Sequence, residues 1–257
     1  MSRRDLIRLV VVAVLIGVGA IIVRATSPSA NSASTAIGHA PSGASVLVAS
    51  PLAPVVMQMA PADRISIGSA EALASQVIAG APSDVLITTD TATALVLQSK
   101  GLTGPPVVIA HDRLVVITPP SNPGRIHAFA DLAKPGVRLV VGGPDSSIGR
   151  DARAALAHVG ATAALANVVH EAPDAGAITT AVVLGNADAA VVYASQAQAL
   201  GRRVRTLSIP GSAQPVISDT AAVLTAAPHP GAAAAFLRYL TGPNGRAYLE
   251  RFGFSVP

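Results

Sequence analysis

Small hydroxyl side chains recur where a predicted strand ends and a turn or helix begins. In open parallel sheets, ligands bind just beyond the carboxyl ends of the strands. Helix N-termini at that edge offer free N–H groups and the positive end of the helix dipole, which suit an oxyanion. One such serine is more often a helix cap, so it is the recurrence that indicates a site. The set comprises Ser50, Ser69, Thr88, Thr89, Ser146, Ser147 and Tyr193.

The stretch GSAEALASQVIAGAPSDVLITTD, residues 68–90, admits two interpretations. It reads as a glycine turn, a helix with one apolar face, a second turn and a short strand. Its junctions either present backbone N–H groups to an anion or simply cap a helix that packs on a sheet. Glu71 adds a carboxylate to the first turn of that helix, so the residues alone leave both interpretations open.

Signals for enzymatic chemistry are absent from the sequence. It contains no nucleophile elbow, phosphate-binding loop, dinucleotide fingerprint or zinc-protease motif. It has no cysteine, which excludes disulfides, thiolate zinc sites, thiol catalysis and a lipid-modified cysteine. Its six histidines form no close pair and are expected at the surface. Asp84 and Asp90 flank one predicted strand and are expected to serve as turn or cap residues. We therefore predict no catalytic residue and no cofactor.

The composition excludes further classes of function. Hydrophobic residues make up 51% of the chain and charged residues 12%, which indicates a well-buried core. Aromatic residues make up only 3%, which argues against a carbohydrate cleft or a platform for single-stranded nucleic acid. The net charge is +4, but the basic residues are scattered, so nucleic acid is not expected as a partner.

The N-terminus contains an apolar run over residues 9–23, preceded by arginines. Its length is typical of a signal peptide, whereas a membrane span usually needs about 18 residues or more. A span becomes possible when the run is counted from Leu6 and Arg8 snorkels. Residues 1–24 are therefore predicted to be a signal anchor or a signal peptide. A retained anchor is favoured because Arg24 follows the run directly, and residues 25–43 have the composition of a flexible linker.

From residue 44 onward, short apolar runs alternate with helical patterns. Several runs are continuous in Val, Ile and Leu, as in strands that are buried on both faces. Helices are predicted over 70–78, 150–158 and 232–240, and Pro243 is expected to open a last helix. This alternation predicts an α/β fold with mainly parallel sheets. The predicted strands are 45–49, 63–67, 84–88, 113–118, 137–142, 189–194 and 204–209.

Two proline-rich breaks, TPPSNP at 118–123 and PGSAQP at 210–215, each follow a strand. They are either ordinary surface loops or two crossings between lobes. In the second case one lobe comprises residues 44–118 and 215–257, and the other comprises residues 119–214.

Several segments resemble the type II periplasmic solute-binding proteins, and within them the molybdate-binding components of ABC transporters. The resemblance covers about residues 44 to 257, and the turn AGAPSDV and the terminal RFGF are its most specific parts when taken together. It implies two α/β lobes, built on two mixed, mostly parallel sheets and joined by a two-crossing hinge. The segments are LASQVIAGAPSDVLITTD, HDRLVVITPPSNP, DLAKPGVRLVVGGPDSSIGRDARAAL, GNADAAVVYASQA and AAAFLRYLTGPNGRAYLERFGF.

The resemblance also implies a site in which an oxyanion is bound without any positively charged side chain. The hydroxyl donors carried over by position are Ser50, Ser69 and Tyr193. The backbone N–H donors carried over are Thr89, Ser147 and Ala175.

The first half of this site departs from the family pattern. The family has a serine directly before a leucine after its first strand, whereas here Pro51 precedes Leu52 and can donate no N–H. The second family serine falls on Ala70. Glu71 then places negative charge where a dianion would approach. At ~4 Å and an effective dielectric constant of ~20, two like charges repel by about 4 kcal/mol.

The resemblance implies an exported protein that captures molybdate or tungstate for the permease of an ABC transporter. It is expected to be a monomer at the outer face of the cell membrane, tethered by its N-terminal helix, or secreted if the leader is cleaved. No metal is expected other than that of the oxyanion itself. The alternative is the same fold with a degenerate site, which binds a different ligand or a protein partner at the cell surface.

Overall fold

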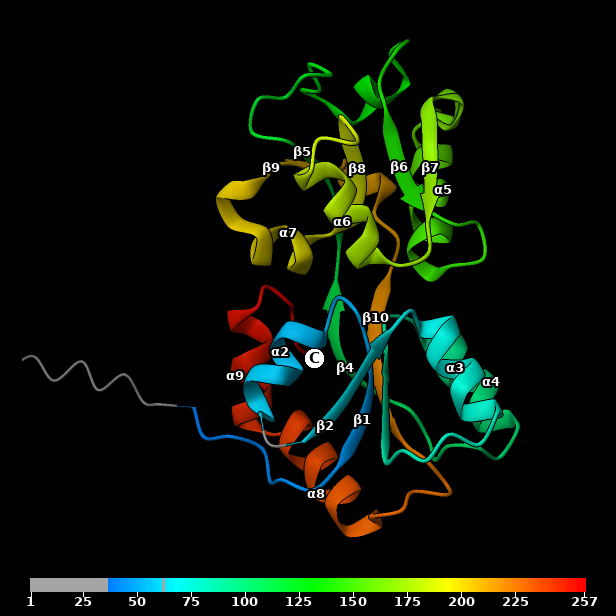
Figure 1. The fold of residues 1–257 in the computed structure, drawn as a ribbon, viewed down its shortest axis with the longest axis vertical. Coiled ribbons are helices and arrows are strands. Elements are labelled where there is room, and N and C mark those ends of the chain that lie inside the picture. The colour runs from blue at the N-terminus through cyan, green and yellow to red at the C-terminus, as the bar shows by residue number, and fades with distance from the viewer. Residues whose placement is uncertain (1–36, 62) are drawn as a thin grey trace, which may run out of the picture. The chain divides into compact units, whose positions relative to one another are not determined.

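The computed structural model describes residues 37–61 and 63–257, which form two five-stranded sheets flanked by helices (Figure 1). We call each sheet with its helices a lobe. The predicted leader and residues 25–36 of the predicted linker lie outside the described residues. Within the described part of the chain, no helix has the length and apolar character needed to cross a membrane.

The first lobe is built from the beginning and the end of the described chain. Its sheet has the order β2-β1-β3-β10-β4, in which β10 alone runs antiparallel to its neighbours. Its strands are β1 (Ser45–Ala49), β2 (Arg64–Gly68), β3 (Val85–Thr88), β4 (Val107–Asp112) and β10 (Ile217–Val223). Its helices are α2 (Ala53–Met59), α3 (Ala70–Ile78), α4 (Thr91–Ser99), α8 (Pro230–Thr241) and α9 (Pro243–Arg251).

The second lobe is continuous in sequence. Its sheet has the order β7-β6-β8-β5-β9, and β5 is the strand that runs antiparallel to its neighbours. Its strands are β5 (Leu114–Thr118), β6 (Leu139–Gly142), β7 (Val168–Ala172), β8 (Ala189–Tyr193) and β9 (Arg205–Ser208). Its helices are α5 (Ser147–His158), α6 (Ala175–Val183) and α7 (Ala194–Leu200). Four short 3-10 turns lie at Phe129–Ala133, Thr162–Asn167, Gly201–Arg203 and Gly211–Ala213.

Burial on both faces explains why the central strands are continuously apolar. In β1, Val46 and Val48 pack into a core with α2, α8 and α9, whereas Leu47 packs on the other face with residues of α3 and α4. Figure 1 shows these two groups of helices on opposite faces of the first sheet. Neither face of β1 is left to water, so each of its five residues is buried.

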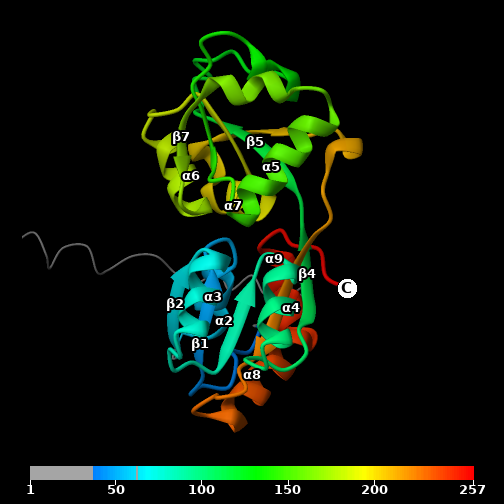
Figure 2. The same cartoon turned by 90° about the vertical axis from the view of Figure 1, so that its right-hand side faces the viewer.

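The chain crosses between the lobes at two places that lie side by side. β4 ends at Asp112 and β5 begins at Leu114 in the other sheet, so the first crossing is at Arg113, not after Thr118 as predicted. The prediction treated residues 113–118 as a strand of the first lobe because it missed β4. The return crossing enters β10, which pairs with β4, so the two connections are neighbours in Figures 1 and 2.

A buried carboxylate ties three separate segments of the first lobe together. Asp84 is fully buried and accepts hydrogen bonds from the backbone N–H groups of Ser45 and His229, both at 2.7 Å. The Ser45 hydroxyl donates a further bond at 2.8 Å. Burial alone raises the pKa of Asp84, but the hydrogen bonds from Ser45 and His229 outweigh it and hold that pKa below its usual value.

Candidate anion-binding site

A small cleft lies where strand ends and helix starts of the two lobes face each other. Residues of both sheets line it, at the carboxyl ends of β1, β2, β3 and β8 and at the starts of α3, α5 and α6. Among the described residues that line it, none is Lys or Arg. The structure brings all six predicted ligand-binding residues to this one cleft, namely Ser50, Ser69, Thr89, Ser147, Ala175 and Tyr193.

The first lobe presents two hydroxyls at neighbouring strand ends. Ser69 is the N-cap of α3, and its oxygen accepts a hydrogen bond from Ala72 N at 3.1 Å. The Ser50 hydroxyl donates to the carbonyl of Gly68 at 3.2 Å, which links the ends of β1 and β2. Pro51 also lines the cleft, so this position offers no N–H group.

The second lobe contributes the start of α5 through an unusually close backbone approach. Ser146 caps the helix by accepting a hydrogen bond from Gly149 N at 3.1 Å. A Cβ atom at Gly149 would lie 1.9 Å from the carbonyl oxygen of Gly143, so only glycine fits there. This contact sets the N–H group and the hydroxyl of Ser147 at the cleft. The helix begins at Ser147, three residues before the predicted start.

The start of α6 supplies the other helix N-terminus. Asp174 caps it, accepting from Ala177 N at 2.9 Å, and both Asp174 and Ala175 line the cleft. The sequence analysis did not single out Asp174. An aspartate before the small, apolar run AGAITTAV is nevertheless an N-cap signal that would have placed the helix start correctly.

Tyr193 lines the cleft and contacts a further acid that the sequence analysis missed. Its side chain is buried, and its hydroxyl donates to Asp151 Oδ2 at 3.4 Å. Burial raises the pKa of Asp151 to about 6, against the opposing effect of that hydrogen bond. Burial and the charge of Asp151 also raise the pKa of Tyr193 well above its usual value, so its hydroxyl stays a donor at neutral pH.

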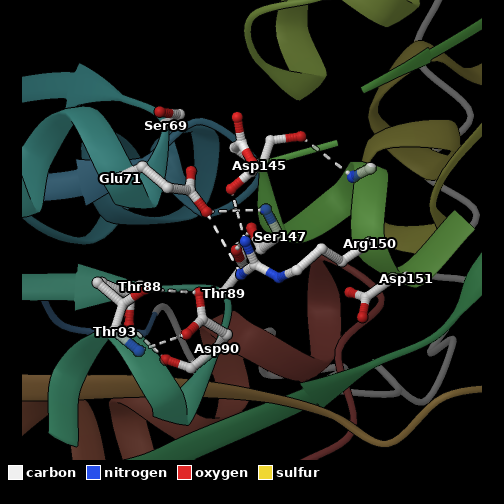
Figure 3. A network of polar contacts seen from close by, with 12 residues as sticks. Ser69, Glu71, Thr88, Thr89, Asp90, Thr93, Asp145, Ser147, Arg150 and Asp151 are labelled. Carbon is white, nitrogen blue, oxygen red and sulfur yellow. Dashed lines mark hydrogen bonds and ion pairs between the residues drawn. The ribbon is translucent and has the colours of Figure 1, made fainter. Parts of the chain in front are cut away.

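Direct contacts bridge the two lobes across the cleft (Figure 3). The Thr89 and Ser147 hydroxyls lie 3.1 Å apart. Glu71 reaches over from α3, and its Oε1 accepts from Ser147 N at 2.8 Å and lies 3.6 Å from an Arg150 nitrogen. Glu71 therefore faces the cleft, and its carboxylate is bound at the N-terminus of α5, as an anion would be.

Replacing Asp151 with asparagine is expected to stabilise the protein at neutral pH. Because its folded-state pKa is raised from 3.8 to about 6, ionisation costs stability that grows between these values and is complete above them. We expect the D151N chain to gain about 1–2 kcal/mol at pH ~7.5, less than the full shift implies because the side chain is partly exposed. The gain should disappear near pH 4. Calorimetric melts at both pH values check this, with the exposed Asp145→Asn as the control; equal gains for both variants would contradict it.

Metal chemistry finds no support in this part of the molecule. Across residues 37–61 and 63–257, no group of three or more His, Asp or Glu side chains is arranged to hold a metal ion. Besides the carboxylates of Glu71 and Asp174, the cleft offers a set of neutral hydroxyls and helix N–H groups. Such donors suit an anion, because they stabilise negative charge without a bound cation.

Residues 44–255 match the family model of the bacterial extracellular solute-binding proteins. The chain belongs to this family. Its members are transport components, so the expectation that the chain is not an enzyme is confirmed, and an extracytoplasmic location follows from the family as well.

Individual relatives support the same assignment. The molybdate-binding protein ModA of Mycobacterium tuberculosis is 34% identical over 191 residues, which cover 74% of this chain and 72% of the relative. The periplasmic molybdate-binding protein of Azotobacter vinelandii superposes with a TM-score of 0.76 at 22% identity, covering 84% of this chain and 100% of that chain. The sulfate-binding protein SubI of M. tuberculosis superposes with a TM-score of 0.70 at 19% identity, covering 83% of this chain and 86% of that chain. The two structural matches share the fold, which confirms the predicted two-lobed α/β architecture.

Proposed function

We propose that this solute-binding protein captures a small tetrahedral oxyanion between its two lobes and delivers it to the permease of an ABC transporter. One observation carries the proposal: six hydroxyl side chains and the N-termini of three helices, drawn from both lobes, converge on one small cleft. Molybdate and tungstate are the first candidates, because relatives with this fold are named for molybdate.

The capture mechanism follows from the two adjacent crossings. Along the described chain, only the connections at Arg113 and before Ile217 join the two sheets, so rotation about them opens the cleft without disturbing either core. Closure brings Ser50 and Ser69 of the first lobe toward Ser147 and Tyr193 of the second. The protein acts as a monomer held at the membrane by its N-terminal apolar run, and the linker keeps the lobes clear of the bilayer.

A calorimetric titration tests the proposal. The full-length chain in mild detergent is titrated with molybdate, tungstate, sulfate, phosphate and arsenate. Heat of binding with at least one of these anions is expected, together with a rise in melting temperature. Ligand at 100 times its dissociation constant stabilises a protein by ~2.7 kcal/mol, which is readily measured. If the chain binds none of these anions, the proposal is wrong.

Proline at position 175 is expected to weaken binding of the captured anion about 10- to 100-fold. It removes one N–H donor, and a hydrogen bond to a charged group contributes about 1.5–3 kcal/mol. The first helical position tolerates proline, and Asp174 already has the extended backbone that suits a residue before proline.

The matched control is Thr91→Pro, at the first position of α4 after the equally extended Asp90. This variant lies outside the cleft and should bind like the wild type. Equal affinity of the Ala175→Pro and Thr91→Pro variants, measured by the same titration, would show that the Ala175 N–H does not contact the ligand.

The alternative is the same fold with a site that takes another ligand or a protein partner. Pro51, Ala70 and Glu71 favour it, since each of the three lines the cleft and differs from the donors expected there.

A further inference from the structure

Glu71 is a carboxylate that reaches across the cleft from the first lobe to the second. Its Oε1 holds the N–H of Ser147, which is one of the donors proposed for the solute. An anion that carries no proton therefore meets a donor that is already occupied and a like charge beside it.

The second oxygen of Glu71 has a different environment. Glu71 Oε2 is buried, and it accepts no hydrogen bond from any of the described residues. The same side chain lines the cleft together with Ser69 and Tyr193. A buried carboxylate oxygen without a donor is costly, so this geometry favours a ligand that brings a donor of its own.

We infer that Glu71 is a specificity-determining residue that makes the cleft prefer oxyanions which still carry a proton. This inference rests on the proposed capture of a tetrahedral oxyanion, but it ranks oxyanions that keep a proton above the molybdate and tungstate that the relatives make the first candidates. A hydrogen oxyanion donates its O–H to Glu71 Oε2 while its other oxygens accept from the surrounding hydroxyls and from Ala175 N–H. At neutral pH phosphate and arsenate retain a proton, whereas molybdate, tungstate and sulfate retain none.

The discrimination arises from two effects that act in the same direction. A protonated anion satisfies the lone acceptor, and it does so without displacing Glu71 from Ser147. A deprotonated anion leaves that acceptor unsatisfied and is repelled by it. Sites built around a hydrogen bond to a ligand hydroxyl reject analogues that lack the hydroxyl far more strongly than apolar sites reject a missing methylene.

The test compares the ranking of anions by the wild type and by Glu71→Gln, using the full-length chain in detergent near pH 7.5. Glutamine keeps an oxygen for Ser147 N–H but replaces the second acceptor with a donor. The wild type should bind phosphate or arsenate at least about 10-fold more tightly than molybdate and sulfate. In the variant this preference should be lost or reversed.

The control is Glu250→Gln, which removes the same charge from an exposed position on α9. It should leave the ranking unchanged. If thermal melts show that Glu71→Gln does not fold, the order of the wild type's affinities for the anions tests the inference by itself.

Three outcomes would overturn the inference, and they differ in what they say about the proposed function. Tighter binding of molybdate than of phosphate by the wild type keeps oxyanion capture but refutes the role of Glu71. If Glu71→Gln binds all the anions more tightly by the same factor, Glu71 acts only as a competing negative charge and does not select among anions. Binding of no anion by either form refutes the proposed function itself.

Discussion

Replacing Gly149 with alanine is expected to weaken ligand capture about 100-fold. Its Cβ would lie 1.9 Å from the carbonyl oxygen of Gly143 and 2.5 Å from that of Gly142, so the start of α5 has to move away from the end of β6. Ser147 moves with it, and a shift of about 1 Å in a site group typically costs ~10²-fold. We expect titration of the full-length Gly149→Ala chain with the anion that the wild type binds to show a loss of this order.

Gly143 provides the matched control in the same turn. A Cβ at Gly143 meets no atom within 4 Å, so Gly143→Ala should bind normally. The Gly149→Ala chain should also unfold more easily, by about 1–3 kcal/mol, as overpacked sites usually do. Wild-type affinity in the Gly149→Ala chain would show that the position of α5 does not govern capture.

Replacing Asp84 with alanine is expected to lower the free energy of unfolding by about 3–5 kcal/mol, because several hydrogen bonds to a charged group, each contributing about 1.5–3 kcal/mol, are lost together. The buried N–H group of Ser45 and the partly buried N–H group of His229 then lose their acceptor. The melting temperature should fall by about 10 °C.

Asp90, at the other end of β3, is the natural comparison. It caps α4 at a partly exposed position through Thr93 N, so Asp90→Ala should cost only about 0.5–2 kcal/mol. Calorimetric melts of both variants check this, and equal costs would contradict the assigned role of Asp84.

The dependence on pH provides a second measurement for Asp84. Its pKa is lowered in the folded state, so its stabilisation is complete above the ordinary value of 3.8 and is lost as the pH falls through the folded-state value. The Asp84→Ala chain should therefore lose less stability on acidification below about pH 4 than the wild type. A parallel loss in both chains would show that Asp84 does not titrate with folding.

The strands could be predicted from the sequence where they are apolar on both faces. The predicted strand 45–49 coincides with β1, and the predicted strand 189–194 extends one residue beyond β8. β10 escaped prediction because Ser218, Asp219 and Thr220 interrupt its apolar pattern, although Asp219 and Thr220 are buried. β7 was missed because it lies at the edge of its sheet with three consecutive exposed residues.

Part of the candidate site could also be predicted from local sequence patterns. Hydroxyls and helix starts follow from local patterns, and the resemblance assigned them to one ligand, so six residues could be named. The contact of Glu71 with Ser147 joins positions 76 residues apart and depends on how the lobes meet. The effect of burial on Asp151 likewise depends on tertiary packing, and no local pattern encodes it.

The discontinuity of the first lobe has a consequence for the order in which the molecule is completed during synthesis. Chains emerge from the ribosome N-terminus first, and domains generally fold as units. The second lobe is continuous and can be complete while β10, α8 and α9 are still unmade. His229, which closes on Asp84, follows it by 145 residues. The first lobe, and with it half of the cleft, is therefore finished only after the residues of α9 have been synthesised.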